Sequence, residues 1–380
     1  MYVLSPVHCN KQMLFFFIRL VRQLTELPNK SNNNQVSLAL YRGVNMSVSF
    51  PVPDFGQSRW KEVPENPLIE YPHARWAIGD PQLLTPGDFD GQWHIFFHGY
   101  LGDQGLAFFH QVSNDGIHWK EHSRWDDWTV GQNYLYCDGS RWIMYYTCDL
   151  REYPELVERY KCHTLIRAKT TRNFVNWTEE VDLILPETGA EREGKMIQAR
   201  NPCVISLPDG RCRLYYSAGT VWLDDAGYEE PKNIFCAEAD NPLGPFKKAG
   251  DPILKPDTSI PYRNYGCGAI KVFGYNDGYI AFYNPIWLDK EKHSRSQICM
   301  LASDDGLVWE EAACNPVITP TTGWRAAIVY QLDVINWKDD MLMYFNARDD
   351  WRDGIERIGC CRLNLNGEQG LQKLRKPFRK

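Results

Sequence analysis

The sequence lacks the features that would place the chain across a membrane or on a nucleic acid. No stretch approaches the roughly 18 uninterrupted apolar residues of a membrane-spanning helix, and the apolar run that starts at Leu14 ends at Arg19. Lys and Arg number 42 against 48 Asp and Glu, which gives a net charge of -6 at pH 7. Because no basic block is rich enough to follow a phosphate backbone, we expect neither a nucleic acid partner nor a membrane span.

Metal-binding and disulfide patterns are also missing. The chain has 12 cysteines but no CxxC pair, and its histidines form no cluster at zinc-ligand spacing. Most of the cysteines lie in apolar, strand-like runs, where a reduced thiol packs as a small hydrophobic group. Examples are Cys148, Cys203, Cys212, Cys236 and Cys299. The pattern predicts core thiols in the reducing cytoplasm, with no metal and no cofactor.

Helical periodicity is nearly absent, whereas apolar and aromatic residues are plentiful. Hydrophobic residues make up 43% of the chain and aromatic residues 13%, enough for a large core. Residues 1–45 include the polar run from Ser31 to Gln35 and share no periodicity with the rest. We therefore expect a weakly ordered extension over residues 1–45 and a single domain over residues 46–380.

Five short strand-like segments end in an aromatic pair, and a polar turn such as Asp90-Gly91 precedes most of them. A polar two-residue turn of this kind is a hairpin signal. The first members of the pairs are 49, 70, 67 and 62 residues apart. The pairs are Phe96-Phe97, Tyr145-Tyr146, Tyr215-Tyr216, Phe282-Tyr283 and Tyr344-Phe345. The recurrence indicates one hairpin with a buried aromatic edge in each repeat.

A second repeated block follows four of these hairpins, with a tight turn and then an aromatic residue. The fifth copy lies at the front of the chain, because Trp60 and Trp309 are each followed six residues later by Asn-Pro. The aromatic anchors are Trp60, Trp119, Trp177, Phe246 and Trp309. Two hairpins per repeat predict an all-β, five-bladed propeller with four-stranded antiparallel blades, closed by the N-terminal strand near Trp60. A two-sheet sandwich is the alternative, but sandwiches lack this regular period.

A propeller brings the beginnings of its innermost strands together at one end of the central channel. The chain places polar side chains at these beginnings and in the loops after the second strands. The strand beginnings offer Asp80, Arg200, Asn201, Tyr265 and Tyr330, and the loops offer His98, Asp149, Asn284 and Arg348. We expect these residues to surround one site.

The segments from Gly79 to Leu84, from Arg200 to Ile205 and from Asn241 to Phe246 carry a resemblance to a known family. The chain from about residue 58 to 365 resembles the five-bladed propeller glycosidases of glycoside hydrolase family 43 and the related invertase, levansucrase and arabinanase superfamily. The resemblance implies a carbohydrate substrate, with Asp80 as the general base. It also implies an Asp at the beginning of the third blade, which orients the reacting groups. The general acid in this pattern is a Glu at the beginning of the fourth blade.

The chain departs from this pattern at two of the three positions. Asn201 stands where the third-blade Asp is expected, and the fourth-blade segment from Tyr265 to Gly268 has no carboxylate. An asparagine cannot shuttle a proton, so a loop must supply the acid that glycosidic cleavage needs. Glu191 and Glu193, just upstream of Arg200, are the first candidates, and we expect Glu193 in this role, with Asn201 and Arg200 positioning the sugar. Further loop candidates are Asp149, Asp224, Asp225, Glu229 and Glu230.

Two functions follow from these observations. The first is a glycoside hydrolase, or a related glycan-processing enzyme, with Asp80 as the base. The second is a propeller that has lost the catalytic acid and binds glycans or takes part in polysaccharide assembly without hydrolysis. A second carboxylate within roughly 10 Å of Asp80 would favour the enzyme.

Overall fold

The computed structural model describes residues 48–71, 77–100, 105–125, 129–187, 189–366 and 374. They belong to a compact unit that begins at Ser47. The predicted extension over residues 1–45 lies outside the described residues, so the division into extension and domain stays a prediction. None of the helices in the described ranges is long and apolar enough to cross a membrane.

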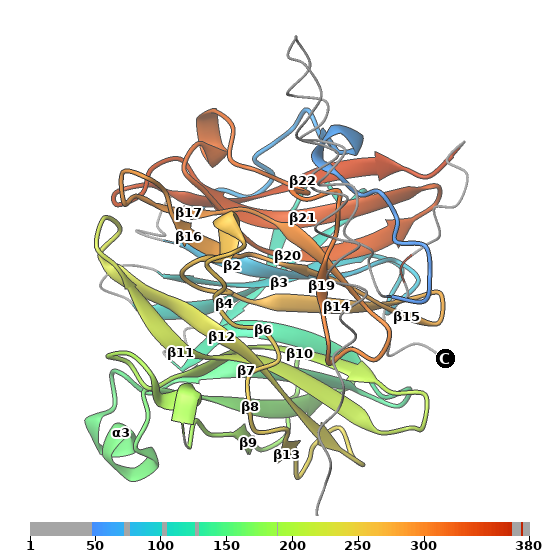
Figure 1. The fold of residues 1–380 in the computed structure, drawn as a ribbon. Helices are drawn as coiled ribbons and strands as arrows, with labels where there is room; N and C mark the ends of the chain where they lie inside the picture. Colours follow the sequence, from blue (N-terminus) through green and yellow to red (C-terminus); the bar gives the residue numbers. More distant parts are fainter. Residues whose placement is uncertain are drawn as a thin grey trace, which may run out of the picture. The chain divides into compact units, whose positions relative to one another are not determined.

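The described chain forms five four-stranded antiparallel sheets, which confirms the predicted all-β propeller (Figure 1). Blade 1 contains β2 (Ile78–Leu84), β3 (Trp93–Tyr100), β4 (Leu106–Ser113) and β5 (Lys120–Trp125). Blade 2 contains β6 (Val130–Cys137), β7 (Trp142–Asp149), β8 (Thr164–Thr171) and β9 (Val181–Ile184). Blade 3 contains β10 (Ala199–Ser206), β11 (Cys212–Leu223), β12 (Tyr228–Ala239) and β13 (Lys247–Lys248).

The last two blades follow the same order, with one addition. Blade 4 contains β14 (Ile270–Tyr275), β15 (Gly278–Tyr283), β18 (Cys299–Ser303) and β19 (Glu310–Glu311). Its second and third strands are separated by a small hairpin of β16 (Ile286–Leu288) and β17 (Ser294–Ser296). Blade 5 contains β20 (Ile328–Trp337), β21 (Asp340–Arg348), β22 (Glu356–Asn364) and, at its outer edge, β1 (Lys61–Glu62).

Short helices lie in the connections between strands. One α-helix, α3 (Pro154–Tyr160), follows β7. Within the described ranges the 3-10 helices are η1 (Gln57–Arg59), η3 (Gly189–Arg192), η4 (Pro261–Arg263) and η5 (Gly323–Arg325).

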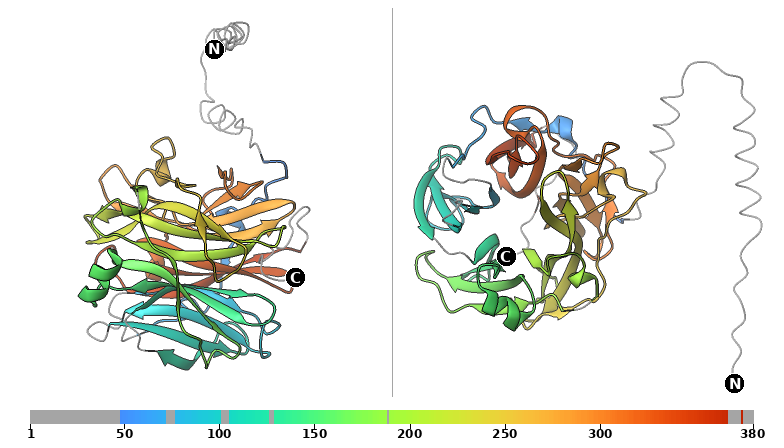
Figure 2. Two further views of the ribbon diagram at one scale, coloured as in Figure 1. Left: turned by 90° about the horizontal axis from the view of Figure 1, so that it is seen from below. Right: turned by 90° about the vertical axis from the view of Figure 1, so that its left-hand side faces the viewer.

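The innermost strands form a ring of neighbours. β2 contacts β6, β6 contacts β10, β10 contacts β14, β14 contacts β20, and β20 contacts β2 again. The right-hand view of Figure 2 looks down this ring, with the blades arranged around a common axis. The beginnings of the five innermost strands therefore share one end of the channel, as the repeat pattern predicts.

The N-terminal segment near Trp60 pairs with the last sheet. Lys61 lies opposite Arg362, and Glu62 lies opposite Cys361, in β22. The side-chain amide of Asn66 donates to the Cys360 carbonyl (2.8 Å) and accepts from its N–H (2.8 Å). Asn315 forms the same pair of bonds with Met300, at 2.9 and 2.6 Å. The two copies of the repeated block therefore play the same part in blades 5 and 4.

Replacing Asn66 with alanine is expected to lower the free energy of unfolding by about 1–3 kcal/mol, because it removes both partners of the Cys360 backbone groups. Urea denaturation measures this change. Asn315→Ala should cost a similar amount, and the neighbouring exposed Glu65→Ala should cost little. An Asn66→Ala protein as stable as the Glu65→Ala control would show that this edge contributes nothing to stability.

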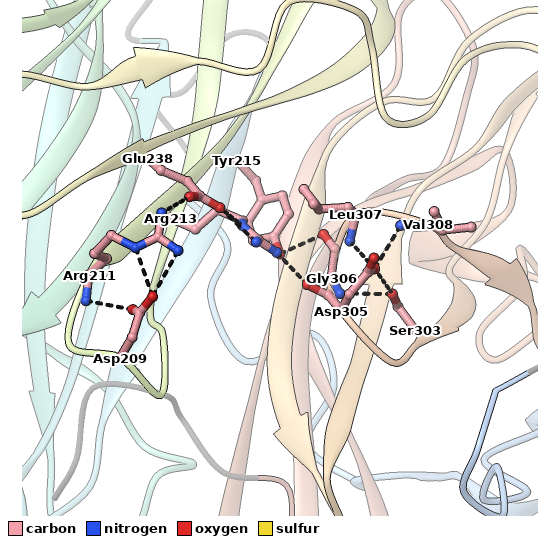
Figure 3. Close-up of polar contacts among 10 residues, drawn as sticks. All are labelled: Asp209, Arg211, Arg213, Tyr215, Glu238, Ser303, Asp305, Gly306, Leu307 and Val308. Carbon is pink, nitrogen blue, oxygen red and sulfur yellow. Dashed lines mark hydrogen bonds and ion pairs between the residues drawn. The ribbon is translucent and has the colours of Figure 1, made fainter.

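The two repeated blocks meet where neighbouring blades touch. In the turn before β19, Asp305 Oδ1 accepts from the N–H groups of Leu307 (2.8 Å) and Val308 (3.0 Å). Tyr215, the first aromatic of its pair, reaches this turn from blade 3 and donates to the Gly306 carbonyl at 2.9 Å (Figure 3). In the same way, the Tyr344 hydroxyl of blade 5 donates to the Gly116 carbonyl of blade 1 at 2.8 Å. The repeated aromatics thus tie blades together, which leaves the strand beginnings available for a site.

Candidate functional site

A cavity of about 360 Å³ lies at the end of the ring where the innermost strands begin. Every blade contributes to its lining. The contributing residues at these strand beginnings are Asp80, Gln132, Asn201, Gly268 and Gln331. The volume is near the lower limit for sites that enclose a small molecule, roughly 300–1,000 Å³.

Local backbone geometry turns Asp80 and Asn201 toward this cavity. Both have a φ of 57°, in the left-handed region, and Gly268 of blade 4 has a φ of 58°. The β2 register shifts between Gly79 and Gln82, so Asp80 lies in a bulge, and β10 shifts in the same way around Asn201. Asp, Asn and Gly tolerate the left-handed region best, and bulges commonly redirect a side chain beside a functional site.

Asp80 is a buried carboxyl, with 6% of its surface exposed. Its Oδ2 lies 3.3 Å from His98 Nδ1, and its backbone N–H donates to Asn346 Oδ1 at 3.3 Å. Burial raises the pKa of Asp80, and the charges of His98, Lys271 and Arg200 partly oppose the rise. The result is a carboxylate that is more basic than an exposed aspartate.

A second carboxyl, Glu230, enters the cavity from β12. Its Oε2 lies 3.7 Å from Arg200 NH2, which also donates to the Glu229 carbonyl at 3.1 Å. Burial raises the pKa of Glu230 to about 7; Arg200 and Arg348 oppose this rise, and repulsion from Asp80 adds to it. Glu230 therefore holds a proton at a pH where an ordinary glutamate has lost it.

A third carboxyl, Glu356, begins β22 of blade 5 and also lines the cavity. It accepts a hydrogen bond from Asn346 Nδ2 (3.3 Å) and lies 3.9 Å from Arg348 Nε. Burial raises the pKa of Glu356 to about 8, against the charge of Arg348, and repulsion from Asp80 and Glu230 contributes. Asn346 thus connects the Asp80 backbone with the Glu356 side chain.

Two tyrosines join blades 3 and 5 across the cavity. The hydroxyls of Tyr228 and Tyr330 form a hydrogen bond with each other. The Arg348 guanidinium lies over the Tyr228 ring, 5.6 Å from its centre. These groups add donors and acceptors of the kind that bind sugar hydroxyls.

Seven of the ten site residues predicted from the sequence line this cavity. They are Asp80, His98, Arg200, Asn201, Asn284, Tyr330 and Arg348. Two further loop carboxylates from the list of alternatives, Glu229 and Glu230, also line it.

Three predicted residues lie elsewhere. The Glu193 carboxylate is half-exposed and pairs with Lys232 at 2.5 Å, so the structure does not bring it to Asp80. Asp149 binds Arg151 through both oxygens and lines an adjacent cavity of about 30 Å³. The Tyr265 hydroxyl donates to the Trp222 carbonyl at 2.9 Å, away from the main cavity. In each case a nearer partner holds the side chain in another place.

Sequence reasoning missed Glu356, Tyr228 and Arg151, which all line the cavity. Glu356 and Tyr228 begin third strands of their blades. In an antiparallel blade, a third strand begins at the same end as the first. A search at third-strand beginnings, beside the first-strand beginnings, would have found both.

Glu356 should make stability depend on pH. Its pKa is about 8 in the folded chain against an ordinary value of 4.5. The proton on Glu356 therefore makes its full contribution to the free energy of unfolding below pH 4.5. This contribution is lost as pH rises through 8, because the folded chain then gives up a proton that it holds more tightly than the unfolded chain does. Replacing Glu356 with glutamine should reduce this loss.

We expect the Tm of Glu356→Gln, relative to the parent, to be higher at pH 8.5 than at pH 4.5, by roughly 2–4 °C for each kcal/mol of stability that the parent loses through the raised pKa of Glu356. Thermal unfolding at the two pH values measures this. The exposed Glu152→Gln is the control and should track the parent. A difference that is the same at both pH values would mean that Glu356 does not titrate in this range.

No protein-family model matches the chain, and no curated protein matches it either. Solved structures do. One is a structure of the GH130 family of mannoside phosphorylases, described as containing glycoside hydrolases that target β-1,2 mannosidic linkages in Candida mannan. It has a TM-score of 0.59 at 13% identity and covers 85% of this chain and 99% of its own.

Two further structures are similar. A thermostable family-43 glycoside hydrolase has a TM-score of 0.51 at 13% identity, covering 80% of this chain and 94% of its own. A family 117 glycoside hydrolase from the marine bacterium Zobellia galactanivorans has a TM-score of 0.53 at 16% identity, covering 83% and 94%. At these identities the likeness shows the fold, and it confirms the predicted resemblance to the propeller glycosidases in that respect.

Proposed function

We propose that this chain is a glycoside hydrolase in which Asp80 is the general base and Glu230 the general acid. The observation that carries the proposal is that both carboxyls line one cavity, and that the pKa of Glu230 is raised to about 7. Glycosidic cleavage needs one ionised and one protonated carboxyl on either side of the bond. Environments that keep two carboxyls in different protonation states supply that pair.

Asp80 suits the role of base. The positive charges of Lys271 and Arg200 favour the ionised form of the Asp80 carboxylate, while burial raises its pKa and so increases its basicity. The bulge in β2 holds it in the cavity, and Asn346 fixes its backbone. A water molecule between Asp80 and the sugar would lose its proton to this carboxylate as it attacks.

Glu230 suits the role of acid better than Glu356 does. The leaving group departs toward solvent, so its acid should lie near the cavity mouth. The Glu230 side chain is 15% exposed and comes from the long hairpin at the rim, whereas Glu356 is 10% exposed and is held by Asn346 and Arg348. We assign Glu356 and Arg348 to binding sugar hydroxyls within the cavity.

Asn201 and Arg200 then have positioning roles. Asn201 is anchored by its backbone N–H on Thr147 Oγ1 (3.1 Å), and its Nδ2 lies 3.4 Å from Ser217 Oγ. The positive charge of Arg200 lowers the pKa of both Asp80 and Glu230, so this residue acts on the base and on the acid. Neither residue transfers a proton in this scheme.

The fold supports this proposal, because the similar structures named above are described as glycoside hydrolases. The alternative from the sequence, a binding propeller without its acid, rested on the missing carboxylate in blade 4. Glu230 lines the cavity from blade 3 instead, and this position supports the enzyme over that alternative.

A screen of nitrophenyl glycosides and of reducing-end-labelled manno-, xylo- and arabino-oligosaccharides tests the proposal. We expect release of a sugar from at least one of them, with the anomer of the first product visible by NMR. The same substrate should be nearly inert with Asp80→Asn. Turnover that is equal in parent and variant would contradict the proposal.

A further inference from the structure

His98 lies beside the proposed base, in the same blade. It stands on β3 directly opposite Gly79 of β2, where the bulge that carries Asp80 begins. Its Nδ1 lies 3.3 Å from Asp80 Oδ2, and the two side chains are 8% and 9% exposed. Both residues line the cavity. The strand pairing therefore holds an imidazole against the carboxylate that accepts a proton in the proposed reaction.

Blade 3 repeats this arrangement with a different residue on its second strand. Ser217 lies opposite Arg200, which directly precedes Asn201 in the bulge of β10. Asn201 Nδ2 lies 3.4 Å from Ser217 Oγ. In both blades, a side chain on the second strand thus supports the side chain that the bulge turns into the cavity. The amide is supported by a hydroxyl, and the carboxylate is supported by an imidazole.

The Nδ1 atom of His98 is buried, and it forms no well-aligned hydrogen bond within the described ranges. A buried polar atom without a partner is costly, so its presence calls for an explanation. In active sites, hydrogen bonds are often long or poorly aligned before a substrate binds and become shorter afterwards. We therefore expect the 3.3 Å contact with Asp80 to become a hydrogen bond when a sugar fills the cavity.

The protonation of His98 decides which bond it can form. Burial lowers the pKa of His98, and the charge of Asp80 and the Gly79 backbone oppose this change. A neutral imidazole carries its proton on only one of its two nitrogens. With the proton on Nδ1, the ring donates to the Asp80 carboxylate. With the proton on Nε2, a lone pair on Nδ1 faces an ionised oxygen, so an ionised Asp80 selects the Nδ1–H form.

Charged groups from the other four blades act on the same pair through their charges. They are Asp149 of blade 2, Arg200 and Glu230 of blade 3, Lys271 of blade 4 and Glu356 of blade 5. All five stay unchanged in the variants of His98 described below. A difference among those variants therefore reports the contact between His98 and Asp80.

We propose that His98 is the positioning residue of Asp80. Its Nδ1–H donates to Asp80 Oδ2, which turns the carboxylate toward the attacking water and favours its ionised form. This inference rests on the proposed function and adds to it a residue that transfers no proton itself.

Nitrogen-15 NMR of protein labelled at histidine tests the inference without a substrate. The signals of His98 are identified by their loss in His98→Asn. At pH 7.5, above the ordinary histidine pKa of about 6.5, we expect a neutral ring with its proton on Nδ1. A ring protonated on Nε2 would overturn the inference and leave the assignments of Asp80 and Glu230 intact.

The pH dependence of kcat/KM, on a substrate found in the screen, is the second test. His98→Leu removes the donor, so the pKa of Asp80 should rise. The acid limb should then move upward by about one pH unit, which lowers kcat/KM on that limb about tenfold. His98→Asn places an amide N–H near the position of Nδ1 and should keep the acid limb of the parent. The alkaline limb, assigned to Glu230, should stay in place in both variants.

His110→Leu is the matched control, because His110 is a buried histidine of the same blade that is not among the residues described in the cavity lining. It should leave both limbs in place, and the Tm of each variant checks its folding. An acid limb that His98→Leu leaves unmoved, or that His98→Asn moves as far, would overturn the inference. A parent that cleaves no substrate would contradict the proposed function, while NMR would still decide whether His98 donates to Asp80.

Discussion

Replacing Asp80 with asparagine is expected to lower kcat by about 10²–10⁴, the usual contribution of a general base, on any glycoside that the parent cleaves. The amide cannot accept the proton of the attacking water. It keeps the size of the side chain and the left-handed backbone, which Asn201 already adopts at the matching position with the same φ of 57°. The Tm should therefore stay within a few degrees of the parent.

Steady-state kinetics and thermal unfolding measure the two quantities on the same preparation. A fall in kcat with an unchanged Tm identifies a chemical role. Retention of full activity would remove Asp80 from the mechanism. A loss of activity that comes with a large fall in Tm would place Asp80 among the residues that hold the fold.

Replacing Glu230 with glutamine is expected to lower kcat by a similar factor of about 10²–10⁴ on unactivated oligosaccharides. Nitrophenyl glycosides should suffer far less, because their leaving group departs without a proton. The pH profile gives an independent test. In the parent, kcat/KM should fall as pH rises above about 7, where Glu230 loses its proton, and the variant should lack this alkaline limb.

Glu193→Gln is the matched control for this experiment. Glu193 is the acid that the sequence favours, but its carboxylate pairs with Lys232 outside the cavity. Its substitution should leave both the rate and the pH profile close to those of the parent. If Glu193→Gln loses the alkaline limb and Glu230→Gln keeps it, the two assignments must be exchanged.

The repeat pattern was sufficient to predict the fold because several repeated residues make the same contact in more than one blade. Asn66 and Asn315 cap equivalent strands with the same pair of bonds. Tyr215 and Tyr344 reach the turns of neighbouring blades in the same way. Contacts that recur with the period of the chain can be found by comparing the chain with itself.

The part of the site that lies on first strands was predictable for the same reason. Asp80 and Asn201 are both followed by proline, and both occupy bulges at the beginning of an inner strand. Their matching positions in two repeats place them at one rim. The bulge itself, which turns them into the cavity, has no signal in a single sequence other than the choice of Asp and Asn.

The acid could not be chosen from the sequence because its position depends on a contact that does not repeat. Glu230 reaches the cavity only because the β11–β12 hairpin extends past its blade and Asp225 binds Ser294, 69 residues away. Glu193 is closer to Asn201 along the chain, but Lys232 holds it on another side. Long-range tertiary contacts of this kind decide between loop carboxylates that look alike in sequence.

The central claim, that Asp80 and Glu230 act on one glycosidic bond, is tested most directly by a crystal structure of Asp80→Asn with an uncleaved oligosaccharide from the screen. The account predicts that the bridging oxygen lies within about 2.6–3.2 Å of a Glu230 carboxyl oxygen. It also predicts that the substituted side chain at position 80 faces the sugar ring from the other side. A bridging oxygen bound by Glu356, or one that lies outside the cavity, would contradict it.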